Sequence, residues 1–341
     1  MKVKCKHVLL MVGFIILIAV IYLLASTFSY VTLSFSHFYK ASVTTTNEEA
    51  FHISYALAKD DHIIFVEKDD DKYKVNKIKA NNIDPVTVTS LNANEVNNYQ
   101  LIVKGKYAYV FYNNNDNVKI IDYTYYKFND LKDLPDGKTI INEFNDSLYS
   151  YNNYTLTKLV VDGDSYTLET SYSVDNEIKD IKNISFINEN EVVISTYNST
   201  IYKYNITENS KTLITDNYLN YEVYNNSIYY VYSYDSSHLG IGLYSGGQNK
   251  NFKVKACDYL SMQVVDNYIY LISENEIYKV NVTREKRHET LQISTYQNAS
   301  FYLQDVLIVS EKLMYLPMVK YEQNTDTNQY EYAYYLYRYK R

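Results

Sequence analysis

The chain has 341 residues, a net charge of −7, 46% apolar residues, and 42 tyrosines but no tryptophan. An apolar share of this size is typical of a folded globular chain, so a largely disordered or collagen-like chain is excluded. The negative charge argues against a protein that binds nucleic acid through a basic face, and we expect no nucleic-acid partner.

The N-terminal segment predicts a membrane anchor. Residues 8–25 are an apolar run close to the minimum length of a membrane-spanning helix, and Lys2, Lys4 and Lys6 precede it. Because positive residues stay on the cytoplasmic side, we expect residues 1–7 to be a cytoplasmic tail. Residues 8–25 would be a transmembrane signal anchor. The rest of the chain would then lie outside a cell membrane that it crosses once.

A cleaved signal peptide is the alternative for this segment. The apolar run is longer than the apolar core of most signal peptides, and Ala25 and Thr27 make a poor cleavage site. The N-terminal sequence of the mature protein distinguishes the two, since a new start near Phe28 would exclude the anchor. With Cys5 inside, Cys257 is the one cysteine outside, so no internal disulfide is expected there.

A degenerate repeat follows the anchor. A polar two-residue turn leads into a short apolar strand seven times, and a polar loop and a second alternating segment follow each strand. The strands begin, at intervals of 36 to 44 residues, near Ile63, Tyr107, Leu148, Val192, Ile228, Ile269 and Leu313.

A unit of about 40 to 45 residues with four short strands is typical of a β-propeller blade. We therefore predict an all-β fold, a seven-bladed β-propeller over residues 51–341, preceded by the single transmembrane helix. Six or eight blades, or two packed β-sandwiches, are the alternatives.

The two ends of the chain predict how the ring closes. The seventh unit reaches Arg341 after its third strand, and residues 30–45 form an alternating segment without a hairpin partner. Residues 26–50 are therefore expected to be a short tether and a ring-closing strand that completes the last blade. Closure removes exposed sheet edges, which otherwise pair with other chains.

Two segments carry a resemblance to known families. Residues 107–122 (YAYVFYNNNDNVKIID) resemble the repeat of YVTN-type propellers on bacterial and archaeal cell surfaces. Residues 267–280 (NYIYLISENEIYKV) are similar to the tyrosine-rich blades of anchored bacterial propellers of the DUF5050 type. The resemblance implies a propeller fold and an extracytoplasmic setting, and it carries over no catalytic residue.

The loops between second and third strands are expected to gather on one acidic face, together with connections between blades that include Asp175 and Glu177. The loops between third and fourth strands, including residues 207–211, would form a more neutral face. A charged face can steer a charged partner. The candidate binding residues on the acidic face are Asp69, Asp70, Asp71, Asp116, Asp235, Glu274 and Glu276.

No cofactor is expected, with calcium as the alternative. Asp69, Asp70 and Asp71 are adjacent, and carboxylate oxygens suit calcium, but no segment has the EF-hand spacing. Any metal ligands therefore remain unassigned.

Enzyme motifs are missing from the chain. No nucleophile elbow, zinc-binding helix motif, P-loop or dinucleotide fingerprint occurs in the sequence, so no catalytic residue is assigned. The function expected is a protein- or cell-envelope-binding scaffold. The alternative is a propeller hydrolase or lyase that acts on envelope glycans or peptides.

The tyrosines allow two interpretations. Tyr229, Tyr230, Tyr232 and Tyr234 lie at strand spacing, where aromatic side chains stabilise sheets by packing. Tyrosine also suits recognition surfaces, because it offers apolar area and a hydroxyl at a low entropic cost. Packing is the default interpretation, and a carbohydrate- or protein-binding aromatic surface is the sharper hypothesis.

Overall fold

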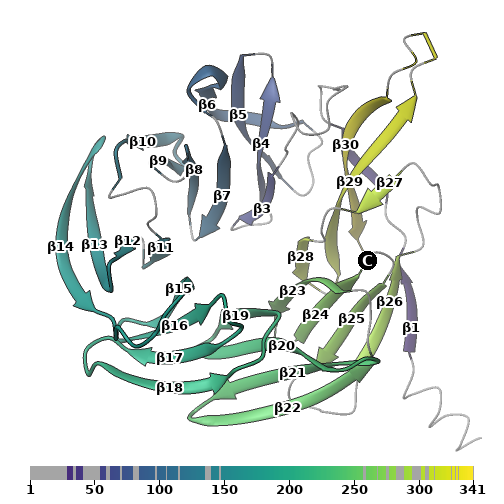
Figure 1. Ribbon diagram of the computed structural model, residues 1–341. Helices are drawn as coiled ribbons and strands as arrows, with labels where there is room; N and C mark the ends of the chain where they lie inside the picture. The colour runs from purple at the N-terminus through teal and green to yellow at the C-terminus, as the bar shows by residue number, and fades with distance from the viewer. Residues whose placement is uncertain are drawn as a thin grey trace, which may run out of the picture.

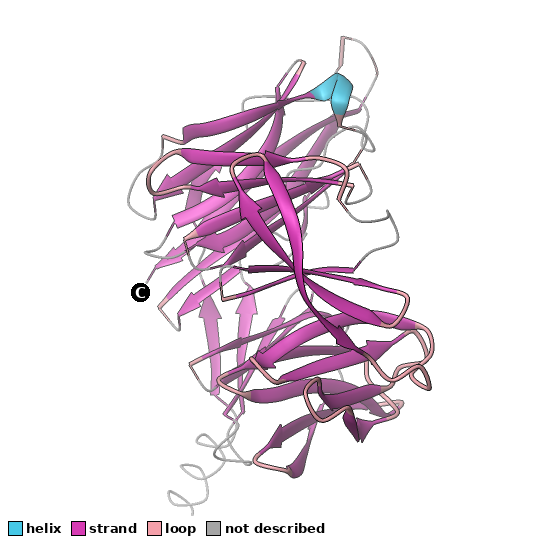
Figure 2. Cartoon of the chain, turned by 90° about the vertical axis from the view of Figure 1, so that its left-hand side faces the viewer, coloured by secondary structure: helices cyan, strands magenta, loops and turns pink. Residues whose placement is uncertain are grey.

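The structure is a computed structural model in which strands make up almost all of the described chain. Figure 2 shows these strands with a short helical turn, η3 (Ala93–Glu95). The described residues are 29–33, 36–40, 54–58, 62–69, 71–79, 84–96, 98–104, 106–113, 116–134, 140–145, 147–255, 259–266, 268–273, 276–281, 288–293, 301–303, 307–310, 312–323, 325–326, 328 and 330–340.

The strands of the described residues form seven small sheets (Figure 1). The first sheet has β3 (Ser54–Ala58), β4 (His62–Asp69), β5 (Lys72–Lys79) and β6 (Val86–Asn92), and the second has β7 (Tyr99–Lys104), β8 (Tyr107–Tyr112), β9 (Asn117–Asp122) and β10 (Lys127–Leu131). The third has β11 (Ile140–Phe144), β12 (Ser147–Asn152), β13 (Thr155–Asp162) and β14 (Ser165–Ser173), and the fourth has β15 (Ile181–Asn188), β16 (Glu191–Thr196), β17 (Ile201–Asn205) and β18 (Ser210–Thr215). The fifth has β19 (Asn220–Tyr224), β20 (Ser227–Asp235), β21 (His238–Ser245) and β22 (Gln248–Lys255), and the sixth has β23 (Tyr259–Val265), β24 (Tyr268–Ser273), β25 (Glu276–Asn281) and β26 (His288–Ile293). The seventh has β27 (Phe301–Leu303), β28 (Leu307–Ser310), β29 (Leu313–Gln323) and β30 (Tyr330–Lys340).

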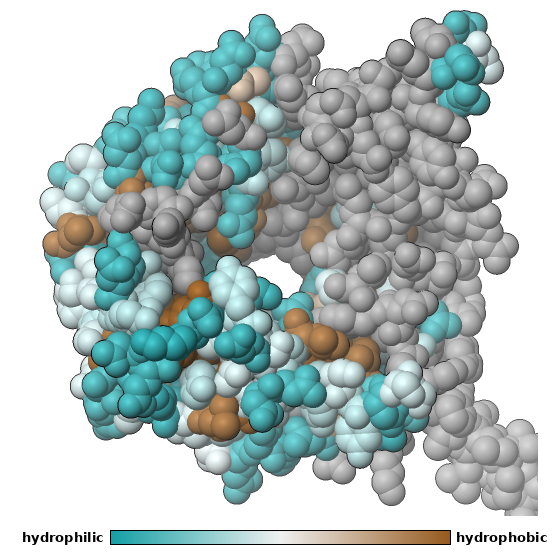
Figure 3. Space-filling view, viewed as in Figure 1, coloured by the Kyte–Doolittle hydropathy of each residue, from teal (hydrophilic) through white to brown (hydrophobic). Residues whose placement is uncertain are grey.

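The sheets are arranged in a ring (Figure 1). Contacts run from each sheet to the next, as between β11 and β15 or β19 and β23, and from β28 of the last sheet to β3 of the first. The first strand of each of the first six sheets and β28 of the seventh face the centre, where the space-filling view shows an opening (Figures 1 and 3). This arrangement defines a β-propeller, and the predicted all-β fold is confirmed.

The predicted repeat is confirmed at each of its seven strands, because every one begins within a residue of its expected start. Asparagine and aspartate serve in place of glycine in several of the turns that precede these strands. Asn145, Asn225, Asn226 and Asp266 all have positive φ angles, between 47° and 57°. Their short polar side chains tolerate the left-handed conformation better than other non-glycine residues do.

The core is divided among the junctions between neighbouring sheets. Strand β20 illustrates the pattern: Tyr229 and Val231 pack toward the sixth sheet, whereas Ile228 and Tyr230 pack toward the fourth. Both faces of the strand are therefore buried. This explains why the second strands read as continuous apolar runs, as a strand buried on both sides does.

Two short N-terminal strands join the last two sheets. Strand β2 (Ser36–Lys40) pairs antiparallel with β30 and is the outer strand of the seventh sheet. Strand β1 (Ser29–Leu33) pairs in parallel with β26 at the edge of the sixth sheet. The single closing strand expected over residues 30–45 is thus two strands that join different sheets.

The expected cytoplasmic tail and anchor, residues 1–7 and 8–25, lie outside the described residues, as does Cys257. Within the described chain, no helix has the length and apolar character required to cross a membrane.

Candidate functional site

The candidate acidic residues lie at the turns between second and third strands, in four different sheets. Asp69 ends β4 and Asp71 follows it, and Asp116 precedes β9, Asp235 ends β20 and Glu276 begins β25. Asp70 and Glu274 lie outside the described residues. Because these turns belong to different sheets, the carboxylates lie apart. Among the residues that the structure describes, no group of three or more His, Cys, Asp or Glu side chains could hold a metal ion.

Asp235 is bound locally rather than free. Its carboxylate accepts a hydrogen bond from the backbone N–H of Ser237 at 2.8 Å and from Lys253 Nζ at 3.1 Å. His238 Nδ1 lies 2.9 Å from it. The hydrogen bond with His238, followed by that with Ser237, lowers the pKa of Asp235.

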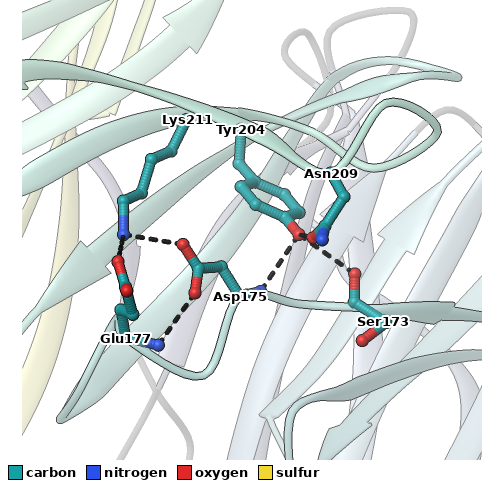
Figure 4. Close-up of polar contacts among 6 residues, drawn as sticks. All are labelled: Ser173, Asp175, Glu177, Tyr204, Asn209 and Lys211. Atoms are coloured by element: carbon teal, nitrogen blue, oxygen red, sulfur yellow. Dashed lines mark hydrogen bonds and ion pairs between the residues drawn. The ribbon is translucent and has the colours of Figure 1, made fainter.

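A polar network joins the third and fourth sheets (Figure 4). Lys211 Nζ lies 2.6 Å from the Asp175 carboxylate and 2.8 Å from that of Glu177. The hydrogen bond from Lys211 lowers the pKa of Asp175, and the two carboxylates raise the pKa of Lys211. A pocket of about 350 Å³ lies beside the network and is lined by Asn153 to Thr155, Ser173 to Asn176, and Asn209.

The hydroxyl of Tyr204 lies at the centre of this network. It accepts from the backbone N–H of Asp175 at 3.0 Å and lies 3.1 Å from the Ser173 carbonyl oxygen. It also contacts the side-chain oxygen of Asn209. The Tyr204 side chain is fully buried, whereas Ser173 and Asn209 are exposed, so its hydroxyl lies where the interior of the junction meets the surface.

This network brings together charged groups that the sequence pattern assigns to opposite faces of the ring. Asp175 and Glu177 come from a connection between sheets, whereas Lys211 is the second residue of the outer strand β18, after a loop assigned to the opposite face. Sheets twist, so the start of an outer strand can reach the end of the preceding sheet. The sequence pattern predicts the loop that precedes β18, but it does not predict the twist between neighbouring sheets that brings Lys211 to Asp175.

A second pocket, of about 410 Å³, lies at the equivalent junction between the fourth and fifth sheets. We call it the tyrosine pocket. It is lined by Leu213, Ile214, Thr215, Asp216 and Asn217 of the fourth sheet and its exit, and by Tyr230, Tyr232, Asn249 and Asn251 of the fifth sheet.

Two tyrosine rings form the floor of the tyrosine pocket. Tyr230 stands opposite Gly242, and Tyr232 stands opposite Gly240, on strand β21. A Cβ atom at Gly242 would lie 1.9 Å from Cζ of Tyr230, and one at Gly240 would lie 2.1 Å from Cζ of Tyr232. The rings therefore lie flat across two glycines, close against the backbone.

The tyrosines run from the interior to the surface. Tyr230 is buried, Tyr232 is half-buried, and Tyr234 is 55% exposed, with ring centroids 6.0 Å and 6.4 Å apart in turn. Lys253 Nζ lies 4.5 Å from the centroid of the Tyr234 ring. Burial raises the pKa values of Tyr230 and Tyr232, so both hydroxyls are neutral at ordinary pH.

The edge strand β22 supplies polar groups to this pocket. The Tyr230 hydroxyl donates to Oδ1 of Asn249 at 2.8 Å and lies 3.2 Å from Oδ1 of Asn251. Nδ2 of Asn249 donates to the Ile214 carbonyl at 3.1 Å and so connects the two sheets. The pocket thus combines a flat aromatic floor with amide side chains at its margin.

A half-buried carboxyl group lies between the inner strands. Glu222 on β19 accepts a hydrogen bond from the backbone N–H of Val264 on β23 at 2.8 Å, and burial raises its pKa to about 7. One sheet further on, Oε1 of Gln263 accepts from the N–H of Ile308 at 3.0 Å in the same way. Because an uncharged glutamine makes the same kind of hydrogen bond one sheet further on, the Glu222 bond is best explained as a structural link between neighbouring inner strands.

The comparisons with known proteins agree with the fold. No protein-family model matches the chain, and no curated protein matches its sequence. An uncharacterized protein of Listeria monocytogenes EGD-e, lmo1340, is similar in structure, with a TM-score of 0.57 and 13% identity over 87% of this chain and 96% of that one. The AfRom2 CNH domain has a TM-score of 0.52 and 9% identity, covering 89% and 98% of the two chains.

Hsv2 of Kluyveromyces lactis, with its loop 6CD replaced by a Gly-Ser linker, has a TM-score of 0.50 and 10% identity over 82% of this chain and 96% of that one. Identities this low show a shared fold and nothing of a shared activity. The chain is therefore a β-propeller built from repeats.

Sequence reasoning found the tyrosines of β20 but missed what makes a pocket of them. The missed residues are Gly240 and Gly242. Their signal was two glycines at alternate positions of a strand, where glycine often marks a close approach of another group. The register that places them under Tyr232 and Tyr230 required the structure.

Proposed function

We propose that the chain is a membrane-anchored, seven-bladed β-propeller, which serves outside the cytoplasm as a binding or scaffold module for a protein or a cell-envelope polymer. Residues 8–25 anchor it, and residues 51–341 present the binding surfaces. The membrane anchor is supported by the apolar run that follows three lysines in the sequence. The setting outside the cytoplasm is supported by the resemblance of residues 107–122 and 267–280 to repeats of surface-anchored propellers.

The observation that carries the binding role is the division of the core among the junctions. The second to sixth sheets use both faces to pack on their neighbours, so this part of the ring is a rigid frame. The turns at its edges and the pockets between outer strands remain available to a partner. Function on a rigid scaffold is commonly carried by such loops.

A pull-down of the tagged full chain from detergent-solubilised membranes tests the proposal. The variant Asp71→Asn, Asp116→Asn, Asp235→Asn removes three charges from the second-to-third-strand turns. We expect it to recover less of the partner than the natural chain does. A matched control, Asp162→Asn, Glu169→Gln, Glu208→Gln, removes three exposed charges elsewhere and should recover the same amount. Recovery of no partner by the natural chain would contradict the proposal.

The hydrolase or lyase alternative would need an acid or base near the centre of the ring. Glu222, with its pKa raised to about 7, is the described residue that favours it. Its bond to a backbone N–H, and the parallel role of Gln263, fit a structural link better. Glycan or peptide turnover that is lost in Glu222→Gln would support the alternative.

A further inference from the structure

We infer that the tyrosine pocket between the fourth and fifth sheets binds a neutral saccharide. This inference rests on the proposed function, because it names the chemistry of the envelope component that one of its surfaces would recognise. It is carried by the floor, the margin and the opposite wall of the pocket together.

The floor exposes more aromatic surface than packing alone requires. Glycine within a strand costs stability, about 0.5–1 kcal/mol relative to alanine. Gly242 makes room for Tyr230, which belongs to the buried core. Core packing therefore accounts for a glycine at position 242. Gly240 makes the same room for Tyr232, whose half-buried ring packs partly against the same core and lines the pocket with the rest of its surface. The second glycine thus holds a flat aromatic face at the surface.

The margin offers hydrogen bonds of both kinds. Asn251 is exposed on the edge strand β22, and its amide side chain can both donate and accept, whereas the Asn249 amide is already bound to Tyr230 and to the Ile214 carbonyl. Tyr232 lines the pocket, and its hydroxyl can donate a hydrogen bond to a ligand and accept one from it. On the opposite wall, Asp216 adds a carboxylate acceptor, and Leu213, 56% exposed, adds apolar surface.

A saccharide matches this combination. A pyranose ring has one face of C–H groups, which can pack on the flat face of an aromatic ring, and a perimeter of hydroxyls for amides and carboxylates. A purely apolar ligand would leave the polar margin without partners, and a phosphate would meet the Asp216 carboxylate. The volume of about 410 Å³ falls in the ordinary range of small-molecule pockets.

Isothermal titration calorimetry of the full chain tests the inference. The probes are maltotriose, cellotriose and tri-N-acetylchitotriose, and the detergent must lack a sugar head group because such a group would compete. We expect at least one probe to bind. Tyr232→Ala should weaken that binding at least tenfold, and Asn251→Ala several-fold. Tyr125→Ala, which removes a 70% exposed tyrosine of the second sheet, should leave it unchanged.

Gly240→Ala provides a test that keeps the tyrosine. The added Cβ must displace the Tyr232 ring, so binding should weaken as in Tyr232→Ala. In a Tyr232→Ala background the same change should cause no further loss. Thermal unfolding of each variant checks that it is folded, and Asn251→Ala, on an exposed edge, carries the test if Gly240→Ala unfolds.

The outcomes distinguish this inference from the proposed function. Failure of all three saccharides to bind, or unchanged binding in Tyr232→Ala, overturns the inference. The proposed function stands in that case if the membrane pull-down still recovers a partner. Loss of a protein partner in Tyr232→Ala, without saccharide binding, would assign the pocket to a protein segment instead and also overturns the inference.

Co-sedimentation with purified envelope polysaccharide separates the two sources of saccharide. Co-sedimentation that Tyr232→Ala abolishes identifies a polymer as the natural ligand. Binding of a trisaccharide without co-sedimentation identifies free saccharides. Both results support the inference. If a trisaccharide binds while the pull-down recovers nothing, the pocket assignment holds and the proposed scaffold role fails.

Discussion

Glu222 shows how one side chain in the ring can make stability depend on pH. It lies between the inner strands β19 and β23, where burial raises its pKa from 4.5 to about 7. Between these values the folded chain keeps a proton that the unfolded chain has released. The free energy of unfolding should therefore fall as the pH rises from about 4.5 to 7, and level off above 7.

The variant Glu222→Gln tests this dependence. The amide keeps an acceptor for the N–H of Val264 but has no proton to lose, as Gln263 does one sheet further on. We expect the variant to be more stable than the natural chain at pH 8, by up to about 3 kcal/mol, and equally stable near pH 4. Urea unfolding at both pH values measures this, and an unchanged slope with pH would contradict it.

Gly242 offers a test of packing at a single position. A methyl group there would press on the buried ring of Tyr230, whose Cζ atom would lie 1.9 Å away. Gly242→Ala should therefore lower the free energy of unfolding by about 1–3 kcal/mol. In a Tyr230→Ala background the same change should cost much less. Equal costs in both backgrounds, measured by urea unfolding, would rule out the ring contact as the cause.

At this scale the sequence predicts the tyrosines but not their roles. Alternation along residues 229–234 places them on two faces of a strand, but both faces are buried at junctions, so hydropathy cannot tell core from pocket. Of the seven acidic candidates, the structure describes five and spreads them over four sheets. Their turns were predictable from the repeat. Their separation depends on the ring.

Among the elements, we expect the junction of the third and fourth sheets to depend on the Tyr204 hydroxyl more than on its ion pairs. Tyr204→Phe would leave the N–H of Asp175 without its acceptor, so we expect a loss of about 1–3 kcal/mol in the free energy of unfolding. Chemical denaturation measures it. A loss near zero would mean that water replaces the hydroxyl.

Lys211→Met is the matched variant at the same junction. Its ion pairs with Asp175 and Glu177 lie near the surface, where salt screens them and the pairing contributes little. We expect a smaller loss of stability than in Tyr204→Phe, decreasing further as salt is added. A larger loss, independent of salt, would show that the ion pairs rather than the hydroxyl hold the junction.

The elements themselves were the most predictable part of the chain. Polar turns followed by apolar runs locate the second strand of all seven sheets, because this pattern depends on local residues alone. The meeting of Asp175 with Lys211 was not predictable. It depends on twist between sheets, which no local pattern in the sequence encodes.

On the scale of the whole molecule, the two N-terminal strands complete the outer edges of the last two sheets. Strand β2 covers the edge of β30, and β1 covers the edge of β26. Deleting residues 30–46 would expose both edges, so we expect aggregation or loss of cooperative unfolding. Size-exclusion chromatography and thermal unfolding of the truncated chain provide the measurement. A monomeric truncation that melts cooperatively would show that the ring does not need these strands.

The central claim is that this propeller binds a component of the cell envelope or a protein held there. Co-sedimentation of the purified full chain with envelopes from the cells that produce it tests the claim most directly. We predict saturable binding that is reduced by Tyr232→Ala or by the triple change at Asp71, Asp116 and Asp235, and retained by Tyr125→Ala. Failure to sediment with envelopes at any concentration, with the chain folded, would contradict the claim.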